Sequence, residues 1–237
     1  MVGTLLVRSC RDGMASIRAN IVPMLLLWAM AVALVAAYYM VPLVAAALEP
    51  LQRWQTSSGK LAAFLNRAVF CGLIPGIFMA LVPSVRPARP WLAIAAQIAW
   101  LGVVGILCDI MYSMNAQVFG TGVDFCTLLW KTLVSQFIWT PFVFAIPSAA
   151  LCLWIGCDFS LARFLRDWPK RYFSRMYLPF LITNWAVWIP AMMAVHSFPT
   201  PLQIQLSGLV GAFWSLLGLE LGRRASSSRT SNIRNDA

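Results

Sequence analysis

Apolar blocks long enough to cross a membrane recur along this chain of 237 residues and alternate with short polar or basic links. A helix needs roughly 20 apolar residues to span the hydrocarbon core of a bilayer, and several blocks reach that length. The blocks are apolar all round rather than at amphipathic spacing, as expected of helices that have no face in water. The pattern predicts an all-α fold, a polytopic transmembrane helical bundle.

The composition excludes several other classes of protein. Hydrophobic residues make up 60% of the chain and charged residues only 11%, whereas a soluble domain carries about 25% charged residues. The net charge of +10 would suit nucleic acid, but the basic residues cluster between the apolar blocks. We therefore expect membrane lipid as a partner and no nucleic acid. The six cysteines show no paired spacing, so we expect neither a zinc site nor a disulfide framework.

Six membrane spans are predicted. They cover about Ile21 to Leu48, Leu61 to Val85, Trp91 to Tyr112, Leu128 to Ile155, Met176 to Phe198 and Pro201 to Leu221. The first apolar stretch is too long for the core of a cleaved signal peptide, so we interpret it as a retained signal anchor.

The same pattern divides the chain into four segments. Residues 1–20 form a basic N-terminal segment, and residues 21–60 hold the signal-anchor span and its link. Residues 61–222 form the main bundle, and residues 223–237 form a polar tail that we expect to be disordered.

Charge placement predicts the orientation of the bundle. With six spans, the two termini share a side with the links after spans two and four, and these segments hold 14 of the 18 Lys and Arg residues. The opposite links hold only Arg53, Lys60 and Lys131, and Arg67 lies inside span two. The positive-inside rule therefore places both termini in the cytosol or on its organellar equivalent.

The link between spans four and five, residues 156–175, predicts an amphipathic segment on the membrane surface. Its apolar residues alternate with basic ones: Leu161, Phe164, Leu165 and Trp168 with Arg163, Arg166, Lys170 and Arg171. Such a pattern suits a helix lying over anionic headgroups, and a docking site for a partner is the less common reason for it.

Two further patterns have structural explanations. Tryptophans near the span ends (Trp54, Trp91, Trp130 and Trp154) predict aromatic belts at the interfaces. Small residues spaced by four (Gly72 and Gly76; Ser207, Gly211 and Ser215) predict closely packed helices.

Ionisable groups within spans are costly and are the first candidates for function. Asp109 lies near the end of span three and Lys131 near the start of span four, so an ion pair at one membrane face is expected. A gating or permeation role and simple surface exposure remain open alternatives for the two residues. Prolines within the spans, such as Pro141 and Pro190, kink helices, which suits either a water-filled path or a packing device.

No catalytic motif is present in the sequence. His196 is the only histidine, so an H-E-x-x-H metal site is excluded, and no nucleophile elbow or phosphate-binding glycine loop occurs. We expect no enzyme, no cofactor and no metal.

Three stretches of the C-terminal half carry a family resemblance. They are Lys131-Thr-Leu-Val-Ser-Gln136-Phe-Ile-Trp-Thr-Pro141, then Asn184-Trp185-Ala-Val-Trp188-Ile-Pro190, and finally Phe198-Pro199 followed by Phe213-Trp214-Ser-Leu-Leu. In order and spacing they resemble the Mpv-seventeen and twenty-two-kilodalton peroxisomal membrane protein family. The resemblance implies a core of four to five spans within residues 61–222, with span one as an N-terminal addition.

The chain departs from this family at charged positions. Ser135 replaces the acid of the family's Asp-Gln pair, and Gln203 or Gln205 stands where an arginine is expected. Any ion selectivity that those charges give the family therefore does not carry over to this chain.

The resemblance implies a multi-pass protein of the mitochondrial inner or peroxisomal membrane, proposed to act as a weakly selective channel for small solutes. Bacterial relatives would lie in the cytoplasmic membrane, and a homo-oligomer remains open. The candidate pore or gate residues are Asp109, Lys131, Gln136, Asn184 and Trp188. The resemblance also marks the motif residues Pro141, Trp185, Pro190, Pro199 and Trp214.

Two other functions stay open. The first is a non-conducting scaffold, which the loss of family charges favours. The second is a secondary transporter, which would need broken helices in two repeated halves, and the sequence shows no repeat. A single cavity lined by Asp109, Lys131, Gln136 and Asn184 would favour the channel, whereas separate interfaces would favour the scaffold.

Overall fold

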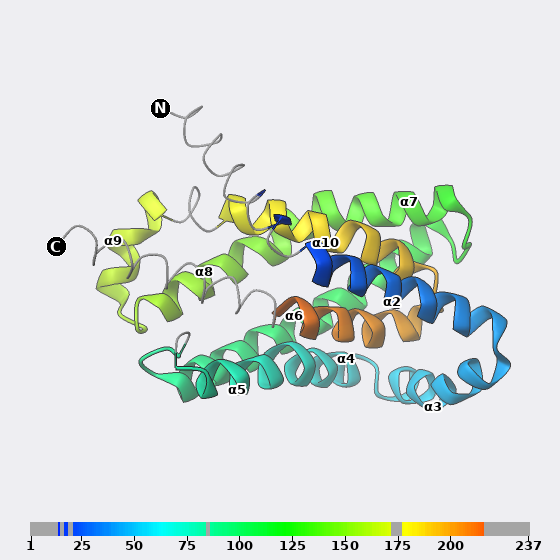
Figure 1. The fold of residues 1–237 in the computed structure, drawn as a ribbon, viewed down its shortest axis with the longest axis horizontal. Coiled ribbons are helices and arrows are strands. Elements are labelled where there is room, and N and C mark those ends of the chain that lie inside the picture. The colour runs from blue at the N-terminus through cyan, green and yellow to red at the C-terminus, as the bar shows by residue number, and fades with distance from the viewer. Residues whose placement is uncertain (1–13, 15–16, 19–20, 84–85, 172–176, 216–237) are drawn as a thin grey trace.

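The computed structural model describes residues 14, 17–18, 21–83, 86–171 and 177–215, and every regular element within them is a helix (Figure 1). The elements are α2 (Ile21–Met40), α3 (Pro42–Ser58), α4 (Lys60–Arg67), α5 (Ile74–Leu81), α6 (Pro90–Phe119), α7 (Phe125–Val134), α8 (Ile146–Gly156), α9 (Leu161–Arg171) and α10 (Leu178–His196). Two π-helical segments, η1 (Ala68–Leu73) and η2 (Ser135–Ala145), join α4 to α5 and α7 to α8, and a last helix covers residues 200–215.

Four helices in the described residues are long and apolar enough to cross a membrane. They are Lys60–Leu81, Pro90–Phe119, Phe125–Gly156 and Leu178–His196, which correspond to predicted spans two to five. The sixth predicted span is helical over residues 200–215, and its remainder lies outside the described residues together with Glu220 and the polar tail. The same holds for most of the basic N-terminal segment.

The first predicted span differs from the structure. The helix stops at Met40, and α3 leaves α2 at an angle of 101°, so the expected continuous span to Leu48 is wrong. The cause is Pro42, which occupies the first turn of α3 and forces the preceding Val41 into an extended conformation (φ −119°, ψ 101°). The two helices therefore make at most one bent span.

A proline also explains the widened π-helical turns of η2. Pro141 lies inside η2 and has no N–H, so the regular hydrogen-bond pattern cannot continue through it. Side chains satisfy the freed carbonyl groups: Thr140 Oγ1 donates to Ser135 O at 2.9 Å, and Trp185 Nε1 donates to Gln136 O at 2.7 Å. The Tyr177 hydroxyl likewise donates to Pro141 O at 3.2 Å. The broken helix is thus held by its neighbours, as a helix in lipid must be.

Small residues bring the helices into close contact. A Cβ atom on Gly105 of α6 would lie 2.2 Å from the Ala63 carbonyl oxygen of α4, and one on Gly72 would lie 2.9 Å from Ile98 Cα. Within η1 and the helix over residues 200–215, Gly72 and Gly211 belong to the predicted small-residue pattern, and both sit at such contacts. The main apolar core joins α2, α6, α10 and the 200–215 helix, and Trp28 Nε1 of α2 donates to Val187 O of α10 at 3.1 Å.

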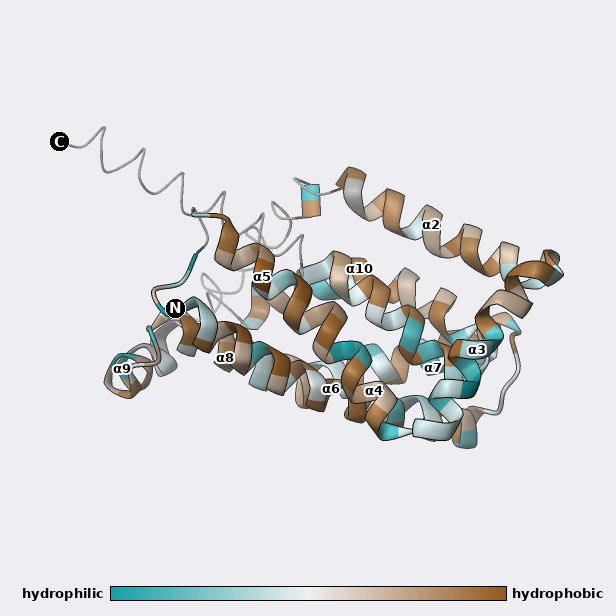
Figure 2. Cartoon of the chain, turned by 90° about the horizontal axis from the view of Figure 1, so that it is seen from below, coloured by the Kyte–Doolittle hydropathy of each residue, from teal (hydrophilic) through white to brown (hydrophobic). Residues whose placement is uncertain are grey.

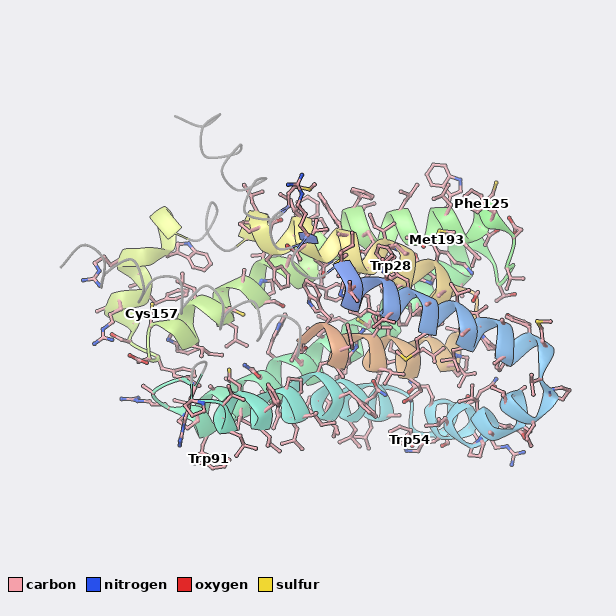
Figure 3. All side chains as sticks on the ribbon, in the orientation of Figure 1. Trp28, Trp54, Trp91, Phe125, Cys157 and Met193 are labelled. Atoms are coloured by element: carbon pink, nitrogen blue, oxygen red, sulfur yellow. The ribbon has the colours of Figure 1, made fainter. Side chains whose placement is uncertain are left out.

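The helices run mainly along one axis and leave two unlike ends. Figure 1 shows α9 at one end; at the other, which we call the polar end, α2 turns into α3 and α7 begins. Hydrophilic segments gather around α3 and α7, whereas α2, α5 and α8 are mainly hydrophobic (Figure 2). Trp91 lies near the α9 end, and Trp54 and Phe125 lie toward the polar end (Figure 3), each with an exposed ring.

Candidate functional site

The interior of the bundle contains an unusual amount of polar side chain. Buried polar or charged residues come from α3, α4, α6, α7, η2, α10 and the helix over residues 200–215. They are Gln55, Asn66, Arg67, Asn115, Lys131, Thr132, Ser135, Gln136, Thr140, Thr183, Asn184, His196, Ser197, Gln203 and Ser207. Most of them fall into three groups, which are described in turn below together with Arg67.

An amide chain links four helices near the polar end. Asn66 Nδ2 of α4 donates to Gln205 Oε1 at 2.5 Å, and Gln205 Nε2 donates to Gln55 Oε1 at 3.1 Å. Gln55 Nε2 of α3 then donates to Asp109 Oδ1 of α6 at 3.0 Å and to Gly59 O at 3.1 Å. Since Gln55 is only 3% exposed, α3 inserts one amide into this end of the bundle.

Arg67 lies in the middle of the bundle without a carboxylate partner among the described residues. Its terminal nitrogens contact Cys71 Sγ at 3.6 Å and Cys108 Sγ at 3.7 Å, and its guanidinium lies 5.5 Å from the centre of the Trp188 ring. The cation–π contact and the polarisable thiols offset only part of the cost of burying a charge. The Tyr112 hydroxyl also lies beside Arg67.

A second hydrogen-bonded group surrounds His196. Ser135 Oγ lies 3.2 Å from His196 Nε2, accepts from Asn115 Nδ2 at 2.9 Å and donates to Lys131 O at 2.8 Å. The Tyr112 ring meets the imidazole edge-on with the ring centres 5.6 Å apart. Tyr112 therefore connects the His196 group to Arg67, and Arg67 adjoins the amide chain through Asn66 of the same helix.

The third group joins α7–η2 to α10. Asn184 Nδ2 donates to Gln136 Oε1 at 3.4 Å, and Thr140 Oγ1 lies 3.5 Å from the same oxygen. Trp185 packs against Phe137 with the rings tilted and their centres 5.0 Å apart, in addition to its bond to the Gln136 carbonyl. The first two motif stretches of the C-terminal half are thus in direct contact.

The expected ion pair between Asp109 and Lys131 is not formed. Asp109 accepts from Gln55, while Lys131 is 2% exposed and lies beside His196. The described ion pairs are Arg53–Glu49 and Arg163–Asp158, both on the surface. The sequence placed both residues near one link, but their side chains leave their helices toward different neighbours.

The other candidate residues divide between interior and surface positions. Trp188 is buried against Arg67, and Pro141 is buried within η2. Trp214 meets Phe180 with the ring centres 6.2 Å apart, and the Pro199 carbonyl accepts from Leu202 N at 2.8 Å at the start of the last helix. Pro190 is exposed on α10.

Several interior polar atoms have no hydrogen-bond partner in the protein. They are Asn66 Oδ1, Arg67 Nε, Thr132 Oγ1, His196 Nδ1 and Gln203 Oε1. Each costs about 1–3 kcal/mol if it stays dry, so five such atoms in one interior favour hydration.

Two depressions on the described part of the chain are not lined by the candidate residues. One is a small apolar groove between α2, α10 and the 200–215 helix, and the other lies on the outer face of α3. In the described residues no three His, Cys, Asp or Glu side chains come together in a way that could hold a metal ion.

Of the residues in these groups, sequence reasoning missed Gln55, whereas Arg67 and Ser135 were expected as polar groups inside spans but were not chosen as pore or gate residues. Arg67 carried a usable signal, since it is a cation in the middle of an apolar block. Gln55 carried none, because its burial depends on the sharp turn at Pro42, which folds α3 back over the bundle.

The fold and this interior define an all-helical protein with four helices able to cross a membrane by length and composition. Comparison with protein families, with curated sequences and with solved structures yields no match.

Proposed function

We propose that the protein is a multi-pass membrane protein whose polar interior is a closed pathway for small polar solutes or ions. The observation that carries this proposal is the connected row of buried polar groups from Asp109 through Arg67 to His196. Ionisable groups inside a bilayer are expensive and are retained mainly where they face partners or water along a pathway. The five interior atoms without a protein partner supply sites for that water.

In this proposal α3 is the closing element. It crosses the polar end of the bundle and holds the interior shut through the hydrogen bonds of Gln55 to Asp109 and Gln205. Opening requires α3 to swing between the breaks at its two ends, Val41 and Gly59, where the helices are already interrupted. The long axis of the bundle then lies across the membrane, with both termini on the cytosolic side.

The test is solute flux and single-channel current with the purified full-length protein in liposomes and planar bilayers. Gln55→Ala removes the amide that closes the interior, and it is expected to raise the open probability. Gln52→Ala is the matched control, because Gln52 is the same residue type on the outer face of the same helix. The double variant Lys131→Ala/Gln136→Leu removes two interior polar groups and is expected to reduce the current.

The outcomes separate clearly. Current that Gln55→Ala raises, that the double variant lowers and that Gln52→Ala leaves unchanged supports a pathway closed by α3. Silent bilayers with folded, inserted wild-type and Gln55→Ala protein contradict conduction.

A scaffold role is the alternative, and a specific observation favours it. Asp109 lies at the interface of α3 and α6, while Gln136 and Asn184 lie at the interface of η2 and α10, so the four expected residues do not line one cavity. In this alternative the polar groups serve as hydrogen-bonded contacts that fix helix pairs, as polar side chains do in lipid. Silent bilayers would leave this function in place.

One structural feature that the sequence did not reveal supports a transporter function. Two candidate spans, Lys60–Leu81 and Phe125–Gly156, are each interrupted by a π-helical segment and run in the same direction along the bundle (Figure 1). Parallel repeats with broken helices occur in transporters. Saturable flux without channel currents would favour this function.

The host membrane and assembly are part of the same proposal. The resemblance of the C-terminal half favours a mitochondrial inner or peroxisomal membrane, or the cytoplasmic membrane of a bacterium. A homo-oligomer remains compatible with a bundle whose outer surface is apolar. Cross-linking in the native membrane distinguishes a monomer from a homo-oligomer.

A further inference from the structure

Helix α9 has an apolar face that only partly contacts the rest of the protein. Phe164 and Trp168 pack against the apolar cluster of α8 and the start of α10, and their ring centres lie 5.0 Å apart. Leu161 and Leu165, one helical turn apart on the adjoining strip of the same face, are 63% and 59% exposed. Two leucines of one amphipathic helix are therefore left bare.

The basic residues of α9 lie on the other side of the helix. Arg163 and Arg166 are exposed; helical register sets Arg163 opposite Leu161 and Leu165 and places Arg166 beside Arg163, away from the leucines. Arg163 also pairs with Asp158 at 3.1 Å. The sequence continues basic beyond them with Lys170, Arg171 and Arg175, so the segment carries an excess of positive charge.

The orientation of α9 is set by the turn before it. Asp158 and Phe159 adopt left-handed conformations (φ 54° and 59°), which end α8 and redirect the chain. Ser160 then begins the helix, and its carbonyl accepts from Phe164 N at 2.9 Å. α9 consequently lies across the long axis of the bundle: it crosses that axis in Figure 1 and is seen end-on in Figure 2.

We propose that α9 is a lipid-binding helix that lies in the surface of the membrane and recruits anionic phospholipid around the bundle. Leu161 and Leu165 enter the acyl region, while Arg163 and Arg166 contact phosphate groups. The apolar face of the helix matches the acyl-chain region of an anionic bilayer, and its cationic face matches the phosphate headgroups above that region. The helix also begins five residues after the candidate span Phe125–Gly156 ends, which places it at the depth of the headgroups.

The position of α9 couples it to two helices of the bundle. Because Phe164 and Trp168 pack on α8 and α10, a lipid that draws α9 toward the surface acts directly on the two helices that flank it. The inference does not depend on whether the interior conducts, since it concerns only the outer surface.

The first experiment measures depth by photo-cross-linking in vesicles of phosphatidylcholine with phosphatidylglycerol. Benzoylphenylalanine replaces Leu165 in one sample of the full-length protein and Arg163 in the matched control on the opposite face. Position 165 is expected to cross-link to lipid acyl chains, and position 163 is not. Cross-linking of position 165 to a protein, or equal lipid cross-linking at both positions, overturns the proposal.

The second experiment measures lipid selectivity by native mass spectrometry of protein released from the same mixed bilayers. Arg163→Gln/Arg166→Gln is expected to reduce retained phosphatidylglycerol by about fivefold for each arginine removed. Arg53→Gln, which removes an exposed arginine from α3, is the control and should retain the wild-type lipid ratio. Arg166→Gln alone keeps the Arg163–Asp158 pair and guards against misfolding. Unchanged lipid retention in folded variants overturns the proposal.

Discussion

Gln55 and Asp109, 54 positions apart in sequence, are joined by a 3.0 Å hydrogen bond that attaches α3 to the interior of the bundle. A second long-range hydrogen bond, from Gln205 Nε2 to Gln55 Oε1 at 3.1 Å, attaches the same amide to the helix over residues 200–215. The Asp109 carboxylate is half-buried, so the hydrogen bond that it accepts stabilises the fold in addition to any role in a pathway.

The first prediction concerns the acceptor at position 109. Asp109→Asn keeps an oxygen for Gln55 and is expected to leave the free energy of unfolding close to that of the wild type. Asp109→Leu removes this acceptor from a Gln55 N–H and should lower the free energy of unfolding by about 1–3 kcal/mol. Reversible unfolding in mixed micelles measures both. Equal loss in the two variants would show that charge, rather than the hydrogen bond, matters at this position.

The second prediction concerns close packing of α4 on α6. Gly105→Ala would place a methyl group 2.2 Å from the Ala63 carbonyl oxygen, and because backbone cannot yield easily we expect a loss of about 1–3 kcal/mol. Gly156→Ala is the control, since nothing lies within 4 Å of its added Cβ atom. Thermal unfolding of the two variants should differ, and equal melting temperatures would contradict the observed contact.

The third prediction separates stability from function at Arg67. Arg67→Met keeps the side-chain length and removes a buried charge that has no carboxylate partner, so the free energy of unfolding should stay the same or rise by about 1–4 kcal/mol. If Arg67 is retained for a pathway, the same variant loses flux. Arg53→Met on the surface is the control for both measurements. A variant that loses stability would show that the contacts with Cys71, Cys108 and Trp188 exceed the cost of burial.

The fourth prediction tests the orientation with native cysteines. Cys126 and Cys152 are the exposed cysteines of the described residues, and Cys152 lies on the apolar candidate span. In a Cys10→Ser background, a membrane-impermeant maleimide should label Cys126 alone, and only from the side opposite the termini. Labelling from the cytosolic side would reverse the predicted topology.

The fifth prediction concerns the N-cap of α7. Hydrogen bonds from the hydroxyl and the backbone N–H of Thr127, the latter 3.0 Å long, lower the pKa of Asp124 below its usual value of 3.8. A lowered pKa means that the cap stabilises the fold above pH 3.8 and loses this effect as the pH falls through the native pKa. Asp124→Asn caps without titrating, so the stability difference between it and the wild type should change across this range. A difference independent of pH would contradict the cap.

The candidate site was only partly accessible to sequence reasoning. Gln136, Asn184 and Trp188 were chosen in advance, and each is buried in a polar or cation–π contact. Asp109 and Lys131 were also chosen, but their pairing was wrong, because neighbours in sequence across a link need not point toward each other. Gln55 was missed because no local pattern distinguishes it from the half-buried Gln52 on the outer face of the same helix.

The sequence by itself determined the helical class, the positions of predicted spans two to five and the basic links between them. The reason is that span length and hydropathy are local properties, set by the thickness of a bilayer and by the backbone's need for internal hydrogen bonds. Only the tertiary structure decided which polar groups meet. The turn at Pro42 brought Gln55 to Asp109, and the packing of α10 on η2 brought His196 to Ser135. Those contacts depend on helix rotation and crossing, which arise from the packing of distant residues and leave no mark in a local pattern.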